Sequence, residues 1–103
     1  MVNVGIGAPD KLYLSQNYPN PFNPSTKIKF SIPAQTNLSR NAEFVSLKVY
    51  DIIGNEVATL INEEKTAGEY EIDFDGSELT SGIYFYQLKA GVFTKIQKMT
   101  ILK

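Results

Sequence analysis

Apolar and polar residues alternate along most of this 103-residue chain, which is the pattern of β-strands that bury one face. In residues 26–32, the alternation predicts that Ile28, Phe30 and Ile32 face a core and that Ser31 faces solvent. Further runs of the same kind predict strands at 11–15, 43–51, 56–61, 69–74, 82–89 and 93–102.

The alternation also predicts which side chains of the central strands point inward. Tyr50 and Phe85 fall on the opposite side of their strands and are expected to be outward-facing aromatic residues. The residues expected to point into the core are Val45, Leu47, Val49, Tyr84, Tyr86 and Leu88.

Turn signals separate these runs at fairly regular spacing. Gly54 with Asn55 predicts a tight turn, and Gly68 closes a charged turn over residues 62–67. The polar stretch 34–41 predicts an exposed loop. Seven short strands joined in this way predict an all-β fold, an antiparallel immunoglobulin-like β-sandwich, with a partly closed barrel as the alternative.

Residues 79–86 resemble the tyrosine corner of immunoglobulin-type sandwiches. In that motif, a tyrosine near the start of a late strand donates a hydrogen bond from its hydroxyl to upstream backbone. Gly82 would begin the strand, Tyr84 would be the corner residue, and Tyr86 would follow it into the core. This resemblance favours the sandwich.

The segment Asn17–Pro24 contains three prolines, which hold the backbone near one φ value and remove three amide donors. It is therefore not a helix, and it is a poor central strand. We expect a stiff, polyproline-like connector that buries Tyr18 and Phe22 at the edge of the core. The alternative is a preformed recognition surface made by Asn17, Tyr18, Pro19, Asn20, Pro21 and Phe22.

Charge is unevenly distributed along the chain. Nine of the eleven acidic residues lie between Asp51 and Glu78, where Lys65 is the single base, and no acid follows Glu78. One interpretation is a pair of solvated strand faces that complement each other. The other is a basic C-terminal edge offered to a partner. That edge would carry Lys98 and Lys103, on a last strand expected at the margin of a sheet, where a partner can add a strand of its own.

Composition excludes several classes of function. The net charge of −1 argues against a protein that binds nucleic acid by neutralising phosphates, and no apolar run is long enough to insert into a membrane. Without cysteine or histidine the chain lacks a disulfide framework, a thiolate metal site and the commonest general base, so we expect neither an enzyme nor a cofactor. The Asp73-x-Asp75-Gly76 sequence is similar to the start of a calcium loop but lacks its later ligands, and whether calcium binds there is left open.

A longer resemblance covers residues 12–103. Several blocks are similar, in the correct order, to the type A C-terminal sorting domain of the type IX secretion system, and the proline-asparagine segment is the most specific of them. The blocks are Leu14–Thr26, Ile28–Phe30, Val49–Val57, Ala67–Tyr70, Leu79–Tyr86 and Lys98–Met99.

This resemblance implies a secretion and sorting signal rather than an enzyme. Residues 1–10 would be a linker from an N-terminally fused cargo, and 11–103 the sorting domain. The partners would be the outer-membrane type IX machinery and a sortase-like protease that cuts within residues 1–11 and joins the cargo to the cell surface. The protein would be secreted or held at the surface after passing through the periplasm. The alternative function is an accessory or carbohydrate-binding module of a secreted enzyme, which the absence of tryptophan disfavours.

Overall fold

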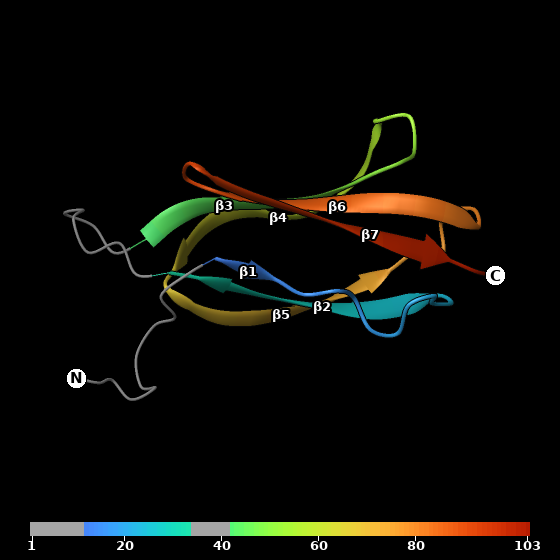
Figure 1. Ribbon diagram of the computed structural model, residues 1–103, viewed down its shortest axis with the longest axis horizontal. Coiled ribbons are helices and arrows are strands. Elements are labelled where there is room, and N and C mark those ends of the chain that lie inside the picture. Colours follow the sequence, from blue (N-terminus) through green and yellow to red (C-terminus); the bar gives the residue numbers. More distant parts are fainter. Residues whose placement is uncertain (1–11, 34–41) are drawn as a thin grey trace.

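The computed structural model describes residues 12–33 and 42–103, which form seven strands in two layers (Figure 1). One sheet has three strands in the order β1-β2-β5, and the other has four in the order β4-β3-β6-β7. The strands are β1 (Tyr13–Leu14), β2 (Ser25–Ile32), β3 (Ala42–Tyr50), β4 (Glu56–Thr66), β5 (Gly68–Asp75), β6 (Gly82–Ala90) and β7 (Phe93–Ile101).

Every pair of neighbouring strands is antiparallel, and the two sheets stack face to face, so the predicted β-sandwich is confirmed. The chain changes sheet between β2 and β3, between β4 and β5, and between β5 and β6. The partly closed barrel is not observed. Within residues 12–33 and 42–103 no ladder joins the two sheets, and the isolated Phe22–Ile101 bridge links β7 to the segment before β2.

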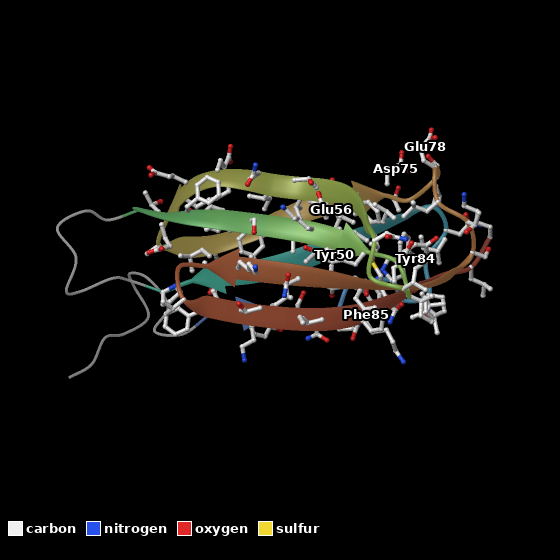
Figure 2. The ribbon with its side chains drawn as sticks, turned by 90° about the horizontal axis from the view of Figure 1, so that it is seen from above. Tyr50, Glu56, Asp75, Glu78, Tyr84 and Phe85 are labelled. Carbon is white, nitrogen blue, oxygen red and sulfur yellow. The ribbon has the colours of Figure 1, made fainter. Side chains whose placement is uncertain are left out.

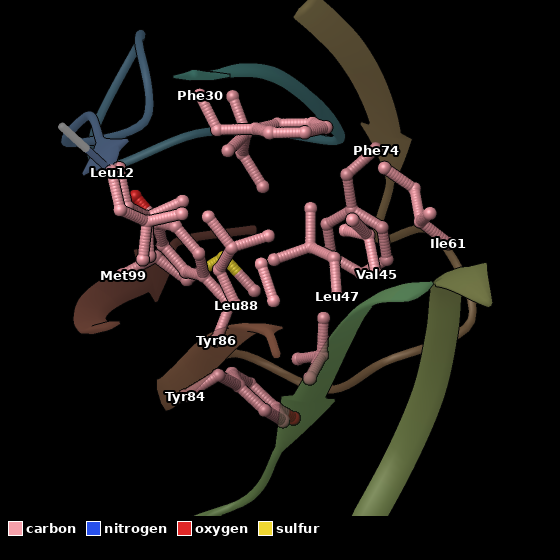
Figure 3. Close-up of a cluster of buried hydrophobic side chains, with 14 of the residues drawn as sticks. Leu12, Phe30, Val45, Leu47, Ile61, Phe74, Tyr84, Tyr86, Leu88 and Met99 are labelled. Carbon is pink, nitrogen blue, oxygen red and sulfur yellow. The ribbon is translucent and has the colours of Figure 1, made fainter. Parts of the chain in front are cut away.

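The core lies between the sheets and consists of the inward faces that the alternation predicts (Figure 3). Tyr86, Leu88 and Leu47 are fully buried, and Tyr84 is buried at the end of the cluster. Ser31 was expected to face solvent, and this was wrong. It lies on the central strand of its sheet, opposite Tyr13 on one side and Glu69 on the other, and these two larger neighbours cover its short side chain.

The predicted charged turn at 62–67 is also wrong, because β4 continues through this stretch to Thr66. The added residues pair with β3, from Asn62 opposite Ser46 to Thr66 opposite Ala42. Strand β4 is at the margin of its sheet, where charged side chains remain in water and so do not oppose strand formation. The loop predicted at 34–41 lies outside the described residues.

Two tyrosine corners mark two crossings between the sheets. The Tyr84 hydroxyl donates to the Thr80 carbonyl at 2.9 Å, which confirms the predicted corner. The Tyr70 hydroxyl donates in the same way to the Thr66 carbonyl at 2.6 Å. Both sites have the sequence Thr-x-Gly-x-Tyr, and the glycines, Gly68 and Gly82, have φ values of 153° and 152° that other residues rarely adopt. The second corner was not anticipated from the sequence.

The turn after β3 is closed by Asp51. Its Oδ1 atom accepts hydrogen bonds from the amides of Asn55 at 2.8 Å and Ile53 at 3.1 Å, and Gly54 completes the turn with a φ of 96°. These bonds, that from Asn55 above all, lower the pKa of the Asp51 carboxyl. The predicted Gly54–Asn55 turn is therefore confirmed.

We expect Tyr70→Phe and Tyr84→Phe each to lower the free energy of unfolding by about 1 kcal/mol, because each removes one hydroxyl hydrogen bond and keeps the ring. Chemical denaturation measures the change. Tyr50→Phe is the matched control, since no hydrogen bond joins the Tyr50 hydroxyl to the described residues. Unchanged midpoints for both corner variants would show that the corners do not stabilise the crossings.

Asp51→Asn should destabilise the domain more at pH 7 than at pH 3. The folded-state pKa of Asp51 is lower than its value in the unfolded chain, which is near 3.9. Its contribution is therefore present above that value and is lost as the pH falls through the folded-state pKa. Denaturation midpoints of both proteins at the two pH values test this. An equal difference at pH 7 and pH 3 would contradict it.

Candidate functional site

The proline segment lies along the C-terminal half of β7 and closes that part of the sheet margin (Figure 1). The Phe22 amide donates to the Thr100 carbonyl at 3.1 Å, and the Leu102 amide donates to the Phe22 carbonyl at 3.0 Å. The Thr100 amide donates to Oδ1 of Asn20 at 2.9 Å. The segment therefore takes the place of a neighbouring strand over residues 100–102 without being a regular strand itself.

Asn17 holds the bend of this segment from inside. It is 2% exposed, and its Nδ2 donates at 3.0 Å to both the Pro19 carbonyl and Oγ1 of Thr26. The Thr26 hydroxyl donates to the same Pro19 carbonyl at 2.8 Å, and Nε2 of Gln16 donates to Oδ1 of Asn17 at 2.7 Å. A buried amide with all these partners fixes the path of the chain, because any other path would leave polar groups unsatisfied.

Three further bonds attach the residues before Asn17 to the four-stranded sheet. The Tyr86 hydroxyl donates to the Ser15 carbonyl at 2.6 Å, and burial of the ring raises the pKa of Tyr86 to about 12. Nε2 of Gln97 donates to the Leu14 carbonyl at 3.0 Å, and Nε2 of Gln16 donates to the Lys98 carbonyl at 2.6 Å. The start of the described chain and its last strand thus form one hydrogen-bonded unit.

Phe22 closes the open end of the sandwich. Its side chain is 2% exposed, and its ring meets Phe74 edge-on with 6.1 Å between ring centroids. Gly76 lies so close that a Cβ atom there would approach Ile101 to 3.1 Å and the Phe22 ring to 3.2 Å. The Gly76 amide also donates to the Pro24 carbonyl at 2.7 Å. A side chain at this position would require Ile101 or Phe22 to shift by a few tenths of an ångström.

Two expectations for the segment were wrong. Tyr18 is 80% exposed rather than buried, because its backbone pairs with Lys27 and its ring points away from the core. The segment is not polyproline-like either. It bends at residues 19–21, and the peptide bonds before Pro19, Pro21 and Pro24 are cis.

The predicted partner-binding residues do not all lie at one place: Asn20 and Phe22 bond to β7, whereas Tyr18 lies beside Lys27 of β2. By exposure they form two groups. Asn17 and Phe22 are buried, and the others are exposed. Lys103 is held in place, since its Nζ donates to the Ser77 carbonyl at 2.7 Å and its amide to Oγ of Ser81 at 2.9 Å. The exposed group is Tyr18, Pro19, Asn20, Pro21, Lys98 and Lys103.

The remaining candidates lie elsewhere. Tyr50 and Phe85 are opposite each other on β3 and β6, and both are half-buried (Figure 2). Asp73 forms an ion pair with Lys27 at 2.7 Å, and Oδ1 of Asp75 accepts the Ser77 amide at 2.9 Å. In the described ranges no three acidic side chains come close enough to hold a metal ion.

Several residues that build this site were missed from the sequence, namely Gln16, Thr26, Gly76 and Gln97. Their partners are up to 83 positions away in the chain, so no local pattern points to them. Gly76 entered the sequence predictions through the likeness of Asp73-x-Asp75-Gly76 to the start of a calcium loop, which gives no sign of its close approach to Phe22.

The fold and this margin define a β-sandwich module whose first and last segments build one surface. A family model described as "Secretion system C-terminal sorting domain" matches residues 16–102, and the chain therefore belongs to this family, the C-terminal sorting domains of the type IX secretion system. No curated protein matches the chain. The domain is a type IX secretion sorting signal, and the protein that carries it is secreted or reaches the cell surface through the periplasm. No helix in the described ranges is long and apolar enough to cross a membrane.

We expect Asn17→Ala to lower the free energy of unfolding by about 1–3 kcal/mol, because it leaves buried polar groups of Thr26 and Pro19 with fewer partners. Thermal and chemical denaturation measure the change. Asn23→Ala is the matched control, since Asn23 also precedes a proline but is exposed and has no hydrogen bond to the described residues. Equal stability of the two variants would show that Asn17 does not hold the segment.

Proposed function

We propose that the type IX machinery binds the exposed side of the margin formed by the proline segment and the C-terminal half of β7. The observation that supports this is a contact between two distant parts of the chain. The Thr100 amide donates a hydrogen bond to Asn20, which lies 80 positions earlier in the sequence. Pro19 and Pro21, on either side of Asn20, are exposed, and so is Lys98, two residues before Thr100. Tyr18 is exposed as well, and its backbone pairs with Lys27 of β2.

The division between buried and exposed residues supports this proposal. Asn17 and Phe22 cannot contact a receptor while the domain is folded, so their role is to fix the geometry. Rigid, exposed neighbours lose little conformational entropy when a receptor binds them. Because the surface needs both ends of the domain, an incompletely folded chain does not present it. Recognition of this margin would therefore also test whether the domain has folded.

The further steps of the proposed function concern the cargo. We place the domain at residues 11–103, behind a linker of residues 1–10 that joins it to an N-terminal cargo. A sortase-like protease of the outer membrane would remove the domain and attach the cargo to the cell surface. The cut would fall within residues 1–11, which lie outside the described residues.

Fusing residues 11–103 to an inert reporter with a signal peptide should suffice for export in a host with the matching machinery. Lys98→Gln with Lys103→Gln should reduce export and leave the melting temperature nearly unchanged, since exposed charges contribute at most about 1 kcal/mol. Cell fractionation scores export, and thermal melts of the purified domain score folding.

Lys89→Gln is the control, because Lys89 is an exposed lysine on β6, opposite Thr94 at the far end of β7. Normal export of the double variant would remove the two lysines from the proposed contact surface and leave the Tyr18–Pro21 side as the remaining candidate. Failure of the unaltered fusion to leave the periplasm would contradict the proposed function itself.

A further inference from the structure

The proline segment covers only half of the β7 margin. In a β-strand, the amide and carbonyl of one residue point to the same side, and successive residues alternate. Thr100 and Lys98 bond outward to Asn20 and Gln16, so the backbone groups of Ile96 and Thr94 also point away from β6. No hydrogen bond from a described residue reaches this outer side of Ile96 or Thr94. Among the described residues, therefore, none pairs with the outer side of residues 93–96, which we call the open margin.

The side chains along this open margin follow one pattern on both faces. On one face Phe93 is followed two positions later by Lys95, and on the other face Ile96 is followed two positions later by Lys98. Phe93 is 47% exposed and Ile96 is 58% exposed, and both lysines are exposed as well. Each face thus offers one apolar side chain and one positive charge, about 7 Å apart along the strand.

Charge complementarity indicates what fits this margin. No acidic residue follows Glu78, so the charged side chains of β7 itself are Lys95 and Lys98. Cross-strand neighbours favour opposite charges and apolar pairs, whereas like charges directly opposite are unfavourable. An added antiparallel strand would therefore place acids opposite Lys98 and Lys95, and apolar residues opposite Ile96 and Phe93.

We propose that residues 93–96 of β7 bind an acidic, extended segment of a protein partner as an additional antiparallel strand. The first residue of this segment lies beside Lys98 without bonding its backbone, because Gln16 holds the Lys98 carbonyl. From its N-terminus, this segment has the order acid, any residue, apolar, acid, any residue, apolar. The assignment of the partner to the secretion machinery rests on the proposed function, whereas the strand pairing does not. Backbone bonds to Thr94 and Ile96 supply affinity, and the four side-chain positions supply selectivity.

A second copy of the domain is a different occupant of the same margin. Strand β4 forms the opposite margin of this sheet and carries the exposed acids Glu63 and Glu64. Pairing β7 of one copy with β4 of the next would join two different surfaces and continue without closing, as in a fibre. The ion pair of Glu63 with Lys65 at 2.9 Å also reduces the net negative charge of that margin. These points favour a separate partner.

The test uses fluorescein-labelled ten-residue peptides and the purified domain, with binding followed by fluorescence anisotropy. One peptide carries the acid-x-apolar repeat with glutamate and valine, and a second has lysine in place of each glutamate. A third is N-methylated at the amides that would face β7. We expect only the first to bind the unaltered domain, with the other two weaker by at least about tenfold.

Two kinds of variant then separate the contribution of side-chain charge to binding from that of backbone hydrogen bonds. Lys95→Glu with Lys98→Glu should exchange the preference, so that the lysine peptide binds better than the glutamate peptide by about tenfold. Ile96→Pro removes an amide that points away from β6, so β6–β7 pairing remains, and both peptides should bind weakly. Lys29→Glu is the control for general charge, because Lys29 is an exposed lysine on β2 of the other sheet. Thermal melts verify folding of each variant.

The outcomes are distinct. Equal binding of the N-methylated peptide, or no exchange of preference on charge reversal, overturns the strand pairing. Concentration-dependent assembly in analytical ultracentrifugation that Ile96→Pro abolishes shows that a second copy occupies the margin and also overturns it. Export of an Ile96→Pro reporter fusion at the unaltered level overturns only the assignment to the secretion machinery. An unaltered fusion that is not exported contradicts the proposed function, whichever peptide binds.

Discussion

The structure depends on how the backbone of the last strand is satisfied at the margin of its sheet. A strand at a margin has polar backbone groups that need partners, and they are costly where they are shielded from water. In this domain the segment around Asn20 and Phe22 supplies those partners for residues 100–102, although its prolines prevent it from being a regular strand. The prolines remove donors that would have no acceptor there. The segment can therefore cover a margin without extending the sheet.

This constraint explains why buried polar side chains accompany a proline-rich stretch. With few backbone donors available, Asn17 and Thr26 hold the bend through their side chains, and both are about 2% exposed. Phe22 adds apolar burial against Phe74, and Gly76 packs against its ring without a side chain that would crowd it. The most specific part of the sequence is thus largely a folding element. In the proposed function, its contribution to recognition would come from the side chains that it holds outward.

The sequence predicted those features of the fold that a local pattern of residues determines. Alternation placed all seven strands and the inward faces around Tyr86, because burial of one strand face repeats every two residues. It failed for Ser31, whose exposure depends on neighbouring strands, and for the end of β4, where charged residues suit a margin as well as a turn. The exposure of Tyr18 and the contacts of Gln16 depend on pairings between distant positions. The second tyrosine corner, at Tyr70, was not predicted, although the repeated Thr-x-Gly-x-Tyr spacing could have indicated it.

The half-covered margin connects folding to recognition. If the proline segment paired with all of β7, the sheet would have no free donors on that side, and a receptor would have only side chains to contact. If it paired with none, the strand would be open along its full length and prone to pairing with other copies. With residues 100–102 and the Lys98 carbonyl already bonded, Ile96 and Thr94 are the described residues of β7 whose outward amide and carbonyl are both left for an added strand, beside Lys95 and Lys98. In the proposed pairing, a folding constraint at one end of the strand would set the length and position of the binding site at the other.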